Sequence, residues 1–421
     1  MRLIDTMDQQ HLRILHRILS PSLGPLSAPR YQPVMELEST QLISDLLALC
    51  QTSPIVSTTD VYPLFERTQA SNILALHYSH RVPTVDEPLY REVIEIQKKV
   101  TYLAANPNLP DMMPFLRHLP GFLSPWQKDA DALFAEQNDL YFRLLKAGDD
   151  SPGWNATKQA RVEAAKHAPD GLPDIDLAYT LATSIQGGME TSPRQLLWLI
   201  VAALSHNKDF VTRAQAVLDA VVGRERLPSF SDRPQLGYID AVVHELMRWR
   251  PISPGSIPRR ADKADEYNGT KIAKNAIVLA NAYAIGRDPD AFDPAFGSLE
   301  DFIPERWLKN SSMEQDITAQ GDLRNSLPLP VFGQGRRMCL GKRVAIDGSF
   351  MQVAAMLWAF DFESEDQVDL DDMVVTGFMT EPKPFKFRLK PRGSWTAGVV
   401  ERVFGAAEKD LSKLMGTMTA A

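Results

Sequence analysis

The segment that decides the fold runs from residue 332 to residue 341 and reads Phe-Gly-Gln-Gly-Arg-Arg-Met-Cys-Leu-Gly. Its three glycines allow the backbone to turn sharply or to approach a flat group closely. Cys339 lies just before a predicted helix, whose amino-terminal amides favour a negative sulfur, and Arg336 and Arg337 place positive charge nearby. The segment therefore predicts a stabilised thiolate, which is a strong electron donor to a metal.

Two other interpretations of this loop compete with a metal ligand. Free cysteines are often buried structural residues. A nucleotide-binding loop is a poorer fit, because Gly333-x-Gly335 lacks the third glycine of a dinucleotide fingerprint and the Gly-Lys-Ser/Thr ending of a phosphate loop. The loop by itself leaves both a haem ligand and a structural cysteine open.

The composition of the 421-residue chain narrows the classes of protein to which it can belong. A net charge of −8 gives no sign of a nucleic-acid-binding protein, although a local basic patch stays compatible with it. The two cysteines, Cys50 and Cys339, make a disulfide framework or a structural zinc site implausible. The longest apolar run, residues 196–204, is too short to cross a bilayer, so no transmembrane segment is expected in this chain.

Patterns along the chain predict an α+β protein that is mainly α-helical. No linker divides the chain, so we interpret residues 1–392 as one domain and residues 393–421 as a C-terminal extension. An apolar stripe predicts an amphipathic helix in this extension, packed against the body; it consists of Val400, Val403, Phe404, Ala407, Leu411 and Leu414. The other main expectations are a long helix at 177–204 interrupted by Gly187-Gly188 and Pro193, a helix at 238–249, strands at 271–273 and 276–280, a helix at 341–358 and strands within 373–389.

Three further motifs precede the cysteine loop. They are Gly187-Gly-Met-Glu-Thr191-Ser, His244-Glu245-Leu-Met-Arg248 and Phe302-Ile-Pro-Glu-Arg306-Trp. In their order and spacing, these motifs and the cysteine loop resemble the cytochrome P450 superfamily. The resemblance covers residues 10 to 392, and the ordered set is far more specific than any single motif.

The resemblance implies a cytochrome P450 fold that lacks its N-terminal anchor, first helices and part of the main sheet. The segment 10–21 resembles the third major helix of the family, which other members carry further along the chain. Family members act at the cytoplasmic side of the endoplasmic reticulum, and without the anchor this chain is expected in the cytosol.

The resemblance also implies a haem b cofactor. Cys339 would bind its iron, and Arg259 and His16 would reach its propionates. His16 stands where the family often has arginine, and an ordinary surface histidine is an equally open interpretation. The loop residues that would surround the haem are Phe332, Gly333, Gly335, Arg337 and Gly341.

The motif in the long helix suggests proton delivery. Gly188 removes a side chain where a flat cofactor or dioxygen must come close, and Glu190 and Thr191 place an acid beside an alcohol. A kinked core helix with a solvated glutamate is the alternative. By resemblance, Thr191 orders the oxygen and Glu190 relays protons.

Glu245 and Arg248 are three residues apart and share one face of a helix. They could form an ordinary surface pair, worth a few tenths of a kcal/mol. The resemblance implies instead a buried trio with Arg306 that braces the cysteine loop.

The resemblance implies a haem-thiolate monooxygenase that inserts one oxygen atom of O2 into a hydrophobic small molecule, with electrons from NADPH-cytochrome P450 reductase or a similar donor. By the same resemblance Lys342, Arg343 and Arg336 would dock this donor, and an ordinary solvated face is the alternative. The segments 120–126 and 223–228 resemble fungal members of secondary-metabolite pathways. A catalytically impaired, haem-binding remnant of the same family is the alternative; a haem-thiolate isomerase or dehydratase is disfavoured by the intact Glu190-Thr191 pair.

Overall fold

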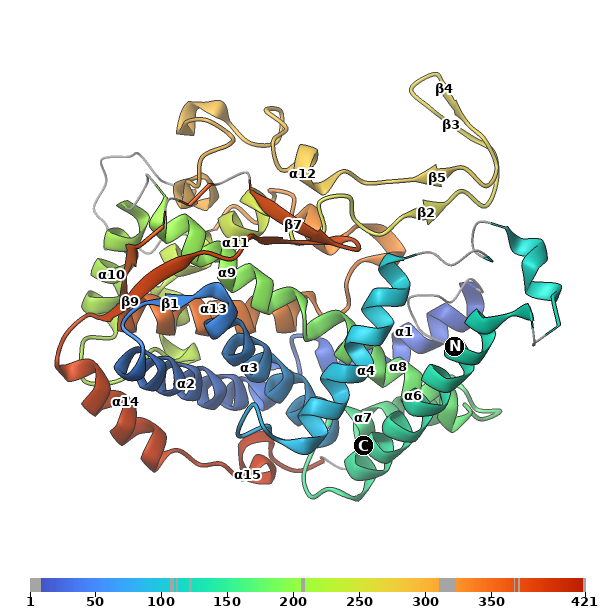
Figure 1. The fold of residues 1–421 in the computed structure, drawn as a ribbon, viewed down its shortest axis with the longest axis horizontal. Coiled ribbons are helices and arrows are strands. Elements are labelled where there is room, and N and C mark those ends of the chain that lie inside the picture. The colour runs from blue at the N-terminus through green and yellow to red at the C-terminus, as the bar shows by residue number, and fades with distance from the viewer. Residues whose placement is uncertain are drawn as a thin grey trace.

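The structure is a computed structural model that describes residues 9–106, 110, 113–120, 123–205, 209–309, 323–366, 368–369 and 372–418. Its longer helices are α1 (Gln9–Leu23), α2 (Ala28–Thr52), α3 (Thr58–Tyr78), α4 (Pro88–Ala105), α6 (Pro125–Asp150), α7 (Ala156–His167), α8 (Asp174–Gly188), α9 (Thr191–Leu204), α10 (Asp209–Val221), α11 (Gly237–Trp249), α13 (Lys342–Ala359) and α14 (Trp395–Ala406). The short helices are α12 (Ala282–Ile285) and α15 (Leu411–Met415), and the 3-10 turns are η2 (Pro114–His118), η4 (Phe230–Gln235), η5 (Pro294–Phe296), η6 (Pro304–Trp307), η7 (Pro330–Phe332) and η8 (Gly335–Arg337). Figure 1 shows this helical body with small strand pairs at its margins, so the expected α+β, mainly helical class is confirmed.

The strands are β1 (Val56–Ser57), β2 (Arg259–Arg260), β3 (Asp265–Tyr267), β4 (Thr270–Ile272), β5 (Ile277–Val278), β6 (Phe360–Ser364), β7 (Met373–Thr376), β8 (Met379–Pro382) and β9 (Lys386–Pro391). They form one antiparallel three-stranded sheet, β1-β9-β6, and three antiparallel pairs. The pairing of Val56 with Phe387 joins the beginning of the helical body to the end of the strand-rich part. A two-residue strand is too short for a periodic pattern to reveal, so sequence patterns did not predict β1.

The two strands expected at 271–273 and 276–280 are separated by a turn at Lys274-Asn275, and Asn275 has the left-handed φ of 68° that asparagine tolerates. The strands on its two sides do not pair with each other. β4 pairs with β3 and β5 pairs with β2, so the turn connects two separate hairpin-like pairs.

The long apolar helix is divided in two. α8 ends at Gly188 and α9 begins at Thr191, with Met189 and Glu190 between them. Pro193 therefore lies in the first turn of α9, where backbone amides have no hydrogen-bond acceptor within the helix, so its lack of an amide hydrogen costs no helical bond. The break places Glu190 and Thr191 at the start of a helix and not inside a kinked one.

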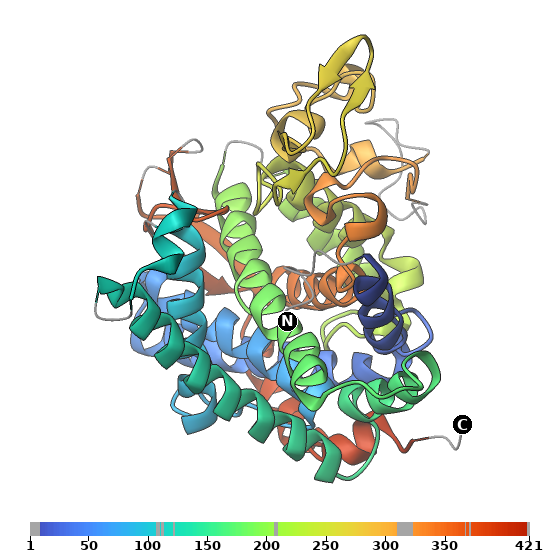
Figure 2. The ribbon, with the colours of Figure 1, turned by 90° about the vertical axis from the view of Figure 1, so that its right-hand side faces the viewer.

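The core of the body is built around α9 and α13, which run through its middle (Figures 1 and 2). Both helices are buried around most of their circumference, and Trp198 and Trp358 are among the largest side chains with no exposure. Each fully buried side chain of this kind contributes about 1.5–3 kcal/mol. α13 contacts α2, α10 and α11, so the helix that follows Cys339 is fixed from three sides.

The C-terminal extension forms α14 and α15, which both pack against α2. Val400 and Leu411 are buried there, and the Trp154 amide donates a 2.7 Å hydrogen bond to the Gly416 carbonyl. The residues of the expected apolar stripe do not lie on one continuous helix, because Ala407 has an extended conformation between α14 and α15. Within the described part of the chain, no helix combines the length and apolar character that crossing a bilayer requires.

Candidate functional site

The cysteine loop is closed by a backbone hydrogen bond. The Cys339 amide donates to the Phe332 carbonyl over 2.8 Å, so the residues between them fold into a compact turn. Gly333 and Gly335 have φ values of +68° and +67°, which side chains with a Cβ rarely adopt. The two glycines are therefore required by the shape of the loop. η7 at the beginning of the loop contacts both α11 and α12.

The Cys339 side chain is exposed on one side of this loop, although protein atoms crowd it on the other. Burial raises the pKa of the Cys339 thiol, whereas the Gly341 amide and the Lys342 ammonium act in the opposite direction. The expected contribution of an amide at the start of the helix is thus present, from Gly341 at the N-cap of α13. The expected cations are different, because Lys342 acts on the sulfur in place of Arg336 and Arg337.

The glycine pair at the end of α8 faces two different environments. A Cβ added to Gly188 would lie 2.9 Å from Cδ1 of Ile73 on α3, whereas one added to Gly187 would meet nothing within 4 Å. The absence of a side chain at Gly188 thus serves helix packing, and the open space assigned to Gly188 from the sequence lies at Gly187. The two glycines are adjacent on a helix and point about 100° apart, so spacing alone could not separate their roles.

Thr191 and Glu190 have separate partners. The Thr191 hydroxyl donates a 2.9 Å hydrogen bond to the Gly187 carbonyl, next to the open position. Glu190 is only 6% exposed, and its carboxylate accepts a hydrogen bond from the Thr101 hydroxyl at 2.9 Å and one from Arg194 at 3.3 Å. The alternative of a solvated glutamate is therefore wrong.

The two residues predicted to reach the propionates, His16 and Arg259, come from distant parts of the sequence, and both lie near Arg337 of the cysteine loop. Burial lowers the pKa of His16, and the positive charge of Arg337 lowers it further. The Arg259 guanidinium donates to the Arg337 carbonyl over 3.5 Å, at the limit of hydrogen-bond distance. The chain thus gathers an imidazole and two guanidinium groups beside the cysteine loop.

Glu245, Arg248 and Arg306 form a buried group. Arg248 and Glu245 are fully buried and make two parallel bonds, from Nε to Oε2 at 2.6 Å and from Nη2 to Oε1 at 2.7 Å. Arg306 is 2% exposed, with its Nε 3.7 Å from Glu245 Oε1. A surface pair is therefore excluded.

This trio organises the irregular segment that precedes the cysteine loop. Arg248 donates to the carbonyls of Gly286, Leu299 and Asp301 at 2.8–3.0 Å. The Ile303 amide and the Trp307 indole in turn donate to the Glu245 carboxylate at 2.8 and 3.0 Å. The direct contacts of the trio are with residues 286–307, and the cysteine loop is reached through α11, which touches η7.

Four polar residues that contact Glu190 or its partner Arg194 were not predicted as site residues. They are Thr101 on α4, Tyr62 on α3, Arg194 on α9 and Glu381 on β8. The spacing of Glu190 and Arg194 by four residues is a signal that could have revealed this pair. The other three come from separate segments, and no spacing connects them.

Of the residues proposed to receive an electron donor, Lys342 and Arg343 lie in the first turn of α13 and Arg336 lies in η8. The ammonium of Lys342 lies 5.7 Å above the Phe332 ring, and Arg343, which is exposed, pairs with the buried Asp347 at 2.9 Å. Arg336 is exposed. A surface hollow of about 430 Å³ beside them is lined in part by Arg233 and Arg343.

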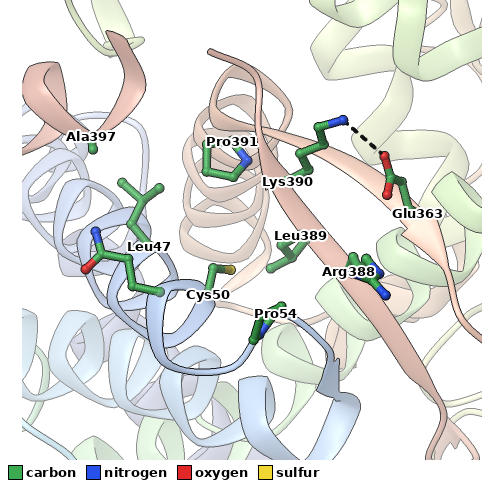
Figure 3. Close-up of a pocket in the computed structure, with 10 residues that line it drawn as sticks. Leu47, Cys50, Pro54, Glu363, Arg388, Leu389, Lys390, Pro391 and Ala397 are labelled. Carbon is green, nitrogen blue, oxygen red and sulfur yellow. Dashed lines mark ion pairs between the residues drawn. The ribbon is translucent and has the colours of Figure 1, made fainter. Parts of the chain in front are cut away.

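A second hollow, of about 400 Å³, lies between the end of α2, β9 and the C-terminal extension (Figure 3). Cys50 points toward it, and burial raises the pKa of this thiol to about 11. A pair of Lys390 with Glu363 at 3.5 Å neutralises its rim. None of the predicted site residues lines this hollow, so it does not belong to the site around Cys339.

The chain is similar to known proteins over nearly its whole length. The family model "Cytochrome P450" matches residues 2–389. The chain is 33% identical over 420 residues to the cytochrome P450 monooxygenase aneD of Aspergillus aculeatus, covering 97% of this chain and 75% of the relative. It is 31% identical over 406 residues to the echilunin cytochrome P450 monooxygenase of Aspergillus ruber, covering 94% and 70%. The chain thus spans about 70–75% of the length of these relatives.

Solved structures show the same fold. A zebra fish cytochrome P450 whose structure contains progesterone superposes with a TM-score of 0.72 at 24% identity, over 91% of this chain and 83% of that chain. The family model and the fungal relatives, both matched over most of the chain, lead to one conclusion: the chain belongs to the cytochrome P450 family of oxygen-incorporating monooxygenases.

Proposed function

We propose that this chain binds haem b through Cys339 and inserts one oxygen atom of O2 into a hydrophobic small molecule. The observation that carries the proposal is the position of Cys339, an exposed residue on a closed loop whose Arg337 lies near Arg259 and His16. A structural cysteine has no need of exposure.

The residues present fit a haem. The thiol supplies a soft, electron-donating ligand, and the two guanidinium groups and the imidazole supply partners for propionates. The open space beside Gly187 lets a flat group approach α8 without a side chain in its way. When bound, the haem supplies the redox chemistry that activates dioxygen.

The polypeptide would orient the reactants and deliver protons. The Thr191 hydroxyl, already held by the Gly187 carbonyl, is placed to order a small polar molecule in the open space. Glu190 would act as the acid that supplies protons to this place, which is general acid catalysis. Its burial restricts the exchange of these protons with bulk water.

The chemical class of the substrate is inferred from the relatives. The Aspergillus ruber enzyme is named for echilunin, and we do not extend that compound to this chain. We propose a hydrophobic secondary metabolite as the substrate, the class that the resemblance to fungal family members implies. We assign the electron donor role to an NADPH-cytochrome P450 reductase. It would dock at Arg336, Lys342 and Arg343 on the face that carries the cysteine loop, where positive charge steers an acidic partner.

Turnover with isotopically labelled dioxygen tests this function. The chain is expressed with haem, mixed with a fungal reductase and NADPH, and given a panel of apolar metabolites. The proposal predicts one labelled atom in the product and one in water. Product formation without label incorporation would contradict a monooxygenase and favour a haem-thiolate isomerase or dehydratase. Bound haem without any turnover would favour the impaired remnant.

A further inference from the structure

The loop that carries Cys339 has two ends, and both are attached to the body of the molecule. The loop begins at η7, and it ends at Gly341, the N-cap of α13. The Lys342 ammonium at the start of α13 lies 5.7 Å from the centre of the Phe332 ring in η7, so the two ends lie side by side. The position of Cys339 therefore depends on how α13 is held relative to η7.

A buried carboxylate fixes α13 near this end. Asp347 has no exposure, and both of its oxygens accept hydrogen bonds. Arg233 on η4 donates to Oδ1 at 2.5 Å, and Oδ2 accepts from Gln32 on α2 at 3.3 Å and from Arg343 on α13 itself at 2.9 Å. Apolar packing is non-directional, whereas bonds to a charged group have a defined geometry, so these bonds fix the rotation of α13 about its own axis.

Arg233 carries this attachment on to α11. Its Nε and Nη2 donate to the two oxygens of Asp240 at 3.1 and 2.8 Å, while Nη1 reaches Asp347. The Arg233 side chain is 17% exposed, and its guanidinium carbon lies 4.6 Å from the centre of the Phe350 ring on α13. One rigid, planar group thus holds a carboxylate of α11 and a carboxylate of α13 at a fixed separation.

Helix α11 also holds the other end of the loop. It contacts η7 directly, and its Glu245–Arg248 pair arranges the irregular segment that precedes η7. Both ends of the cysteine loop are therefore fastened to α11. The beginning is held by packing, and the end is held through Asp240, Arg233 and Asp347.

The charges in this group of ion pairs are balanced. Two guanidinium groups, of Arg233 and Arg343, meet two carboxylates, of Asp240 and Asp347. Every carboxylate oxygen accepts a bond, so the four side chains can stay charged although three of them are largely buried. Such a group is suited to hold segments in place.

We propose that Arg233 is the positioning residue that sets the separation of the two ends of the cysteine loop, and thereby holds the Cys339 sulfur where it can bind iron. The proposal rests on the proposed function, in which Cys339 is the iron ligand. Arg233 acts through Asp347 and α13, so its removal should change the loop more than the rest of the molecule.

Hydrogen exchange of the loop tests this role without haem or turnover. The Met338 and Cys339 amides make hydrogen bonds within the loop, and mass spectrometry of a peptide that spans residues 332–341 follows their exchange in the purified full chain. Arg233→Met keeps an unbranched apolar side chain for the contact with Phe350. Exchange in this peptide should become faster by about tenfold or more, because hydrogen bonds to charged groups that hold the loop ends are lost.

Arg392→Met is the matched control. Arg392 also donates two bonds to one aspartate, Asp219, at 3.0 and 2.9 Å, and its side chain is 10% exposed. Its other side-chain bond among the described residues goes to the Trp358 carbonyl, at the end of α13 that lies away from Cys339. This variant should lower the thermal unfolding midpoint but leave the exchange of the loop unchanged. Equal loop exchange in the two variants would overturn the inference.

The carbon monoxide difference spectrum of the haem-loaded protein gives a second measurement. A smaller share of the reduced protein should show the band of thiolate ligation in Arg233→Met than in Arg392→Met. Arg233→Lys should restore part of this share, because an ammonium keeps the charge but lacks the planar fork that holds two carboxylates. An unchanged share in Arg233→Met would mean that the position of the sulfur does not depend on Arg233.

The two proposals fail in different ways. If the wild type shows no thiolate band, the proposed function fails, and loop exchange alone decides whether Arg233 holds the loop. If Arg233→Met does not fold, Asp347→Asn carries the same test, because it keeps the size of the side chain and removes the charge that Arg233 binds. Exchange that becomes faster throughout the chain, with no greater increase in residues 332–341, would contradict a positioning role.

Discussion

Two glutamate–arginine pairs on contacting helices have opposite surroundings. Glu245 and Arg248 on α11 are completely buried, and their remaining hydrogen-bonding groups are met by backbone carbonyls, a backbone amide and an indole. Glu190 and Arg194 at the start of α9 contact the hydroxyls of Thr101 and Tyr62 and the carboxylate of Glu381. The Glu381 side chain is 26% exposed. Gln195 on α9 donates to the Leu246 carbonyl at 3.0 Å, so the two pairs belong to neighbouring turns of one packed unit.

The difference between the pairs separates a structural role from a chemical one. Backbone partners cannot exchange protons and are fixed by the fold, so the Glu245–Arg248 pair can only hold segments in place. Hydroxyls and carboxylates accept and release protons, so the Glu190–Arg194 pair can change its charge state without unfolding its surroundings. Loss of the first pair should therefore affect assembly, and loss of groups near the second should affect the outcome of the reaction.

The largest expected effect is that of Arg248→Ala. Removal of one partner from a buried pair leaves the Glu245 charge uncompensated, at a cost of about 3–5 kcal/mol. We expect apoprotein or aggregate, measured as haem bound per soluble chain and as the thermal unfolding midpoint.

The control for this variant is Arg143→Ala, which removes two exposed pairs, one with Asp139 on α6 and one with Glu92 on α4. Such surface pairs contribute about 0–1 kcal/mol, so this variant should bind haem normally. Full haem occupancy in Arg248→Ala would show that the α11 pair is not required for assembly, and the distinction between the two pairs would be lost.

An intermediate effect is expected for Thr191→Ala. This variant removes the hydroxyl beside the open position at Gly187 and leaves both glutamate–arginine pairs intact. Haem binding should be retained, while product per NADPH falls by about tenfold or more and hydrogen peroxide rises correspondingly.

Thr183→Ala is the matched control, because the Thr183 hydroxyl makes the same 2.9 Å bond to the carbonyl four residues earlier, within α8. Peroxide and product yields should not change in this control. Tight coupling in Thr191→Ala would place proton delivery elsewhere in the molecule.

The smallest expected effect concerns Gly187 and Gly188 at the end of α8. Gly188→Ala should lower the free energy of unfolding by about 1–2 kcal/mol, because the new Cβ meets Cδ1 of Ile73. Gly187→Ala meets no atom within 4 Å and should change stability by less than about 0.5 kcal/mol. Denaturant unfolding of both variants measures the difference.

A double-mutant cycle of Gly188→Ala with Ile73→Val sharpens this test, because valine lacks the Cδ1 atom that the new Cβ would touch. Gly188→Ala should cost less in the Ile73→Val background than in the wild type. Equal costs in the two backgrounds would mean that Gly188 does not pack against Ile73.

The sequence revealed much of the fold and the main features of the site. The helix predicted at 238–249 is observed as Gly237–Trp249, since its apolar period and the following Pro251 are both local signals. The pairing of Glu245 with Arg248 followed from a three-residue spacing. Such features depend on neighbours along the chain, which a sequence displays directly.

The remaining features depend on contacts between distant segments. The role of Gly188 could not be separated from that of Gly187, because Ile73 arrives from another helix. The partners of the Glu190–Arg194 pair on α3, α4 and β8 have no common spacing, so they could be found only in three dimensions. The amide that acts on the Cys339 thiol was expected from its place before a helix, whereas the cation was misassigned. Arg336 and Arg337 are as near to Cys339 along the chain as Lys342 is, and the turn of the loop decides which charge lies near the sulfur.

The most direct test of the central claim is the carbon monoxide difference spectrum of the reduced protein, recorded for the wild type and for Cys339→Ala. If Cys339 binds the iron, the wild type should show the red-shifted Soret band that is typical of thiolate ligation, and the variant should lose this band. A wild type that binds haem without this band, or a variant that keeps it, would show that Cys339 is not the iron ligand.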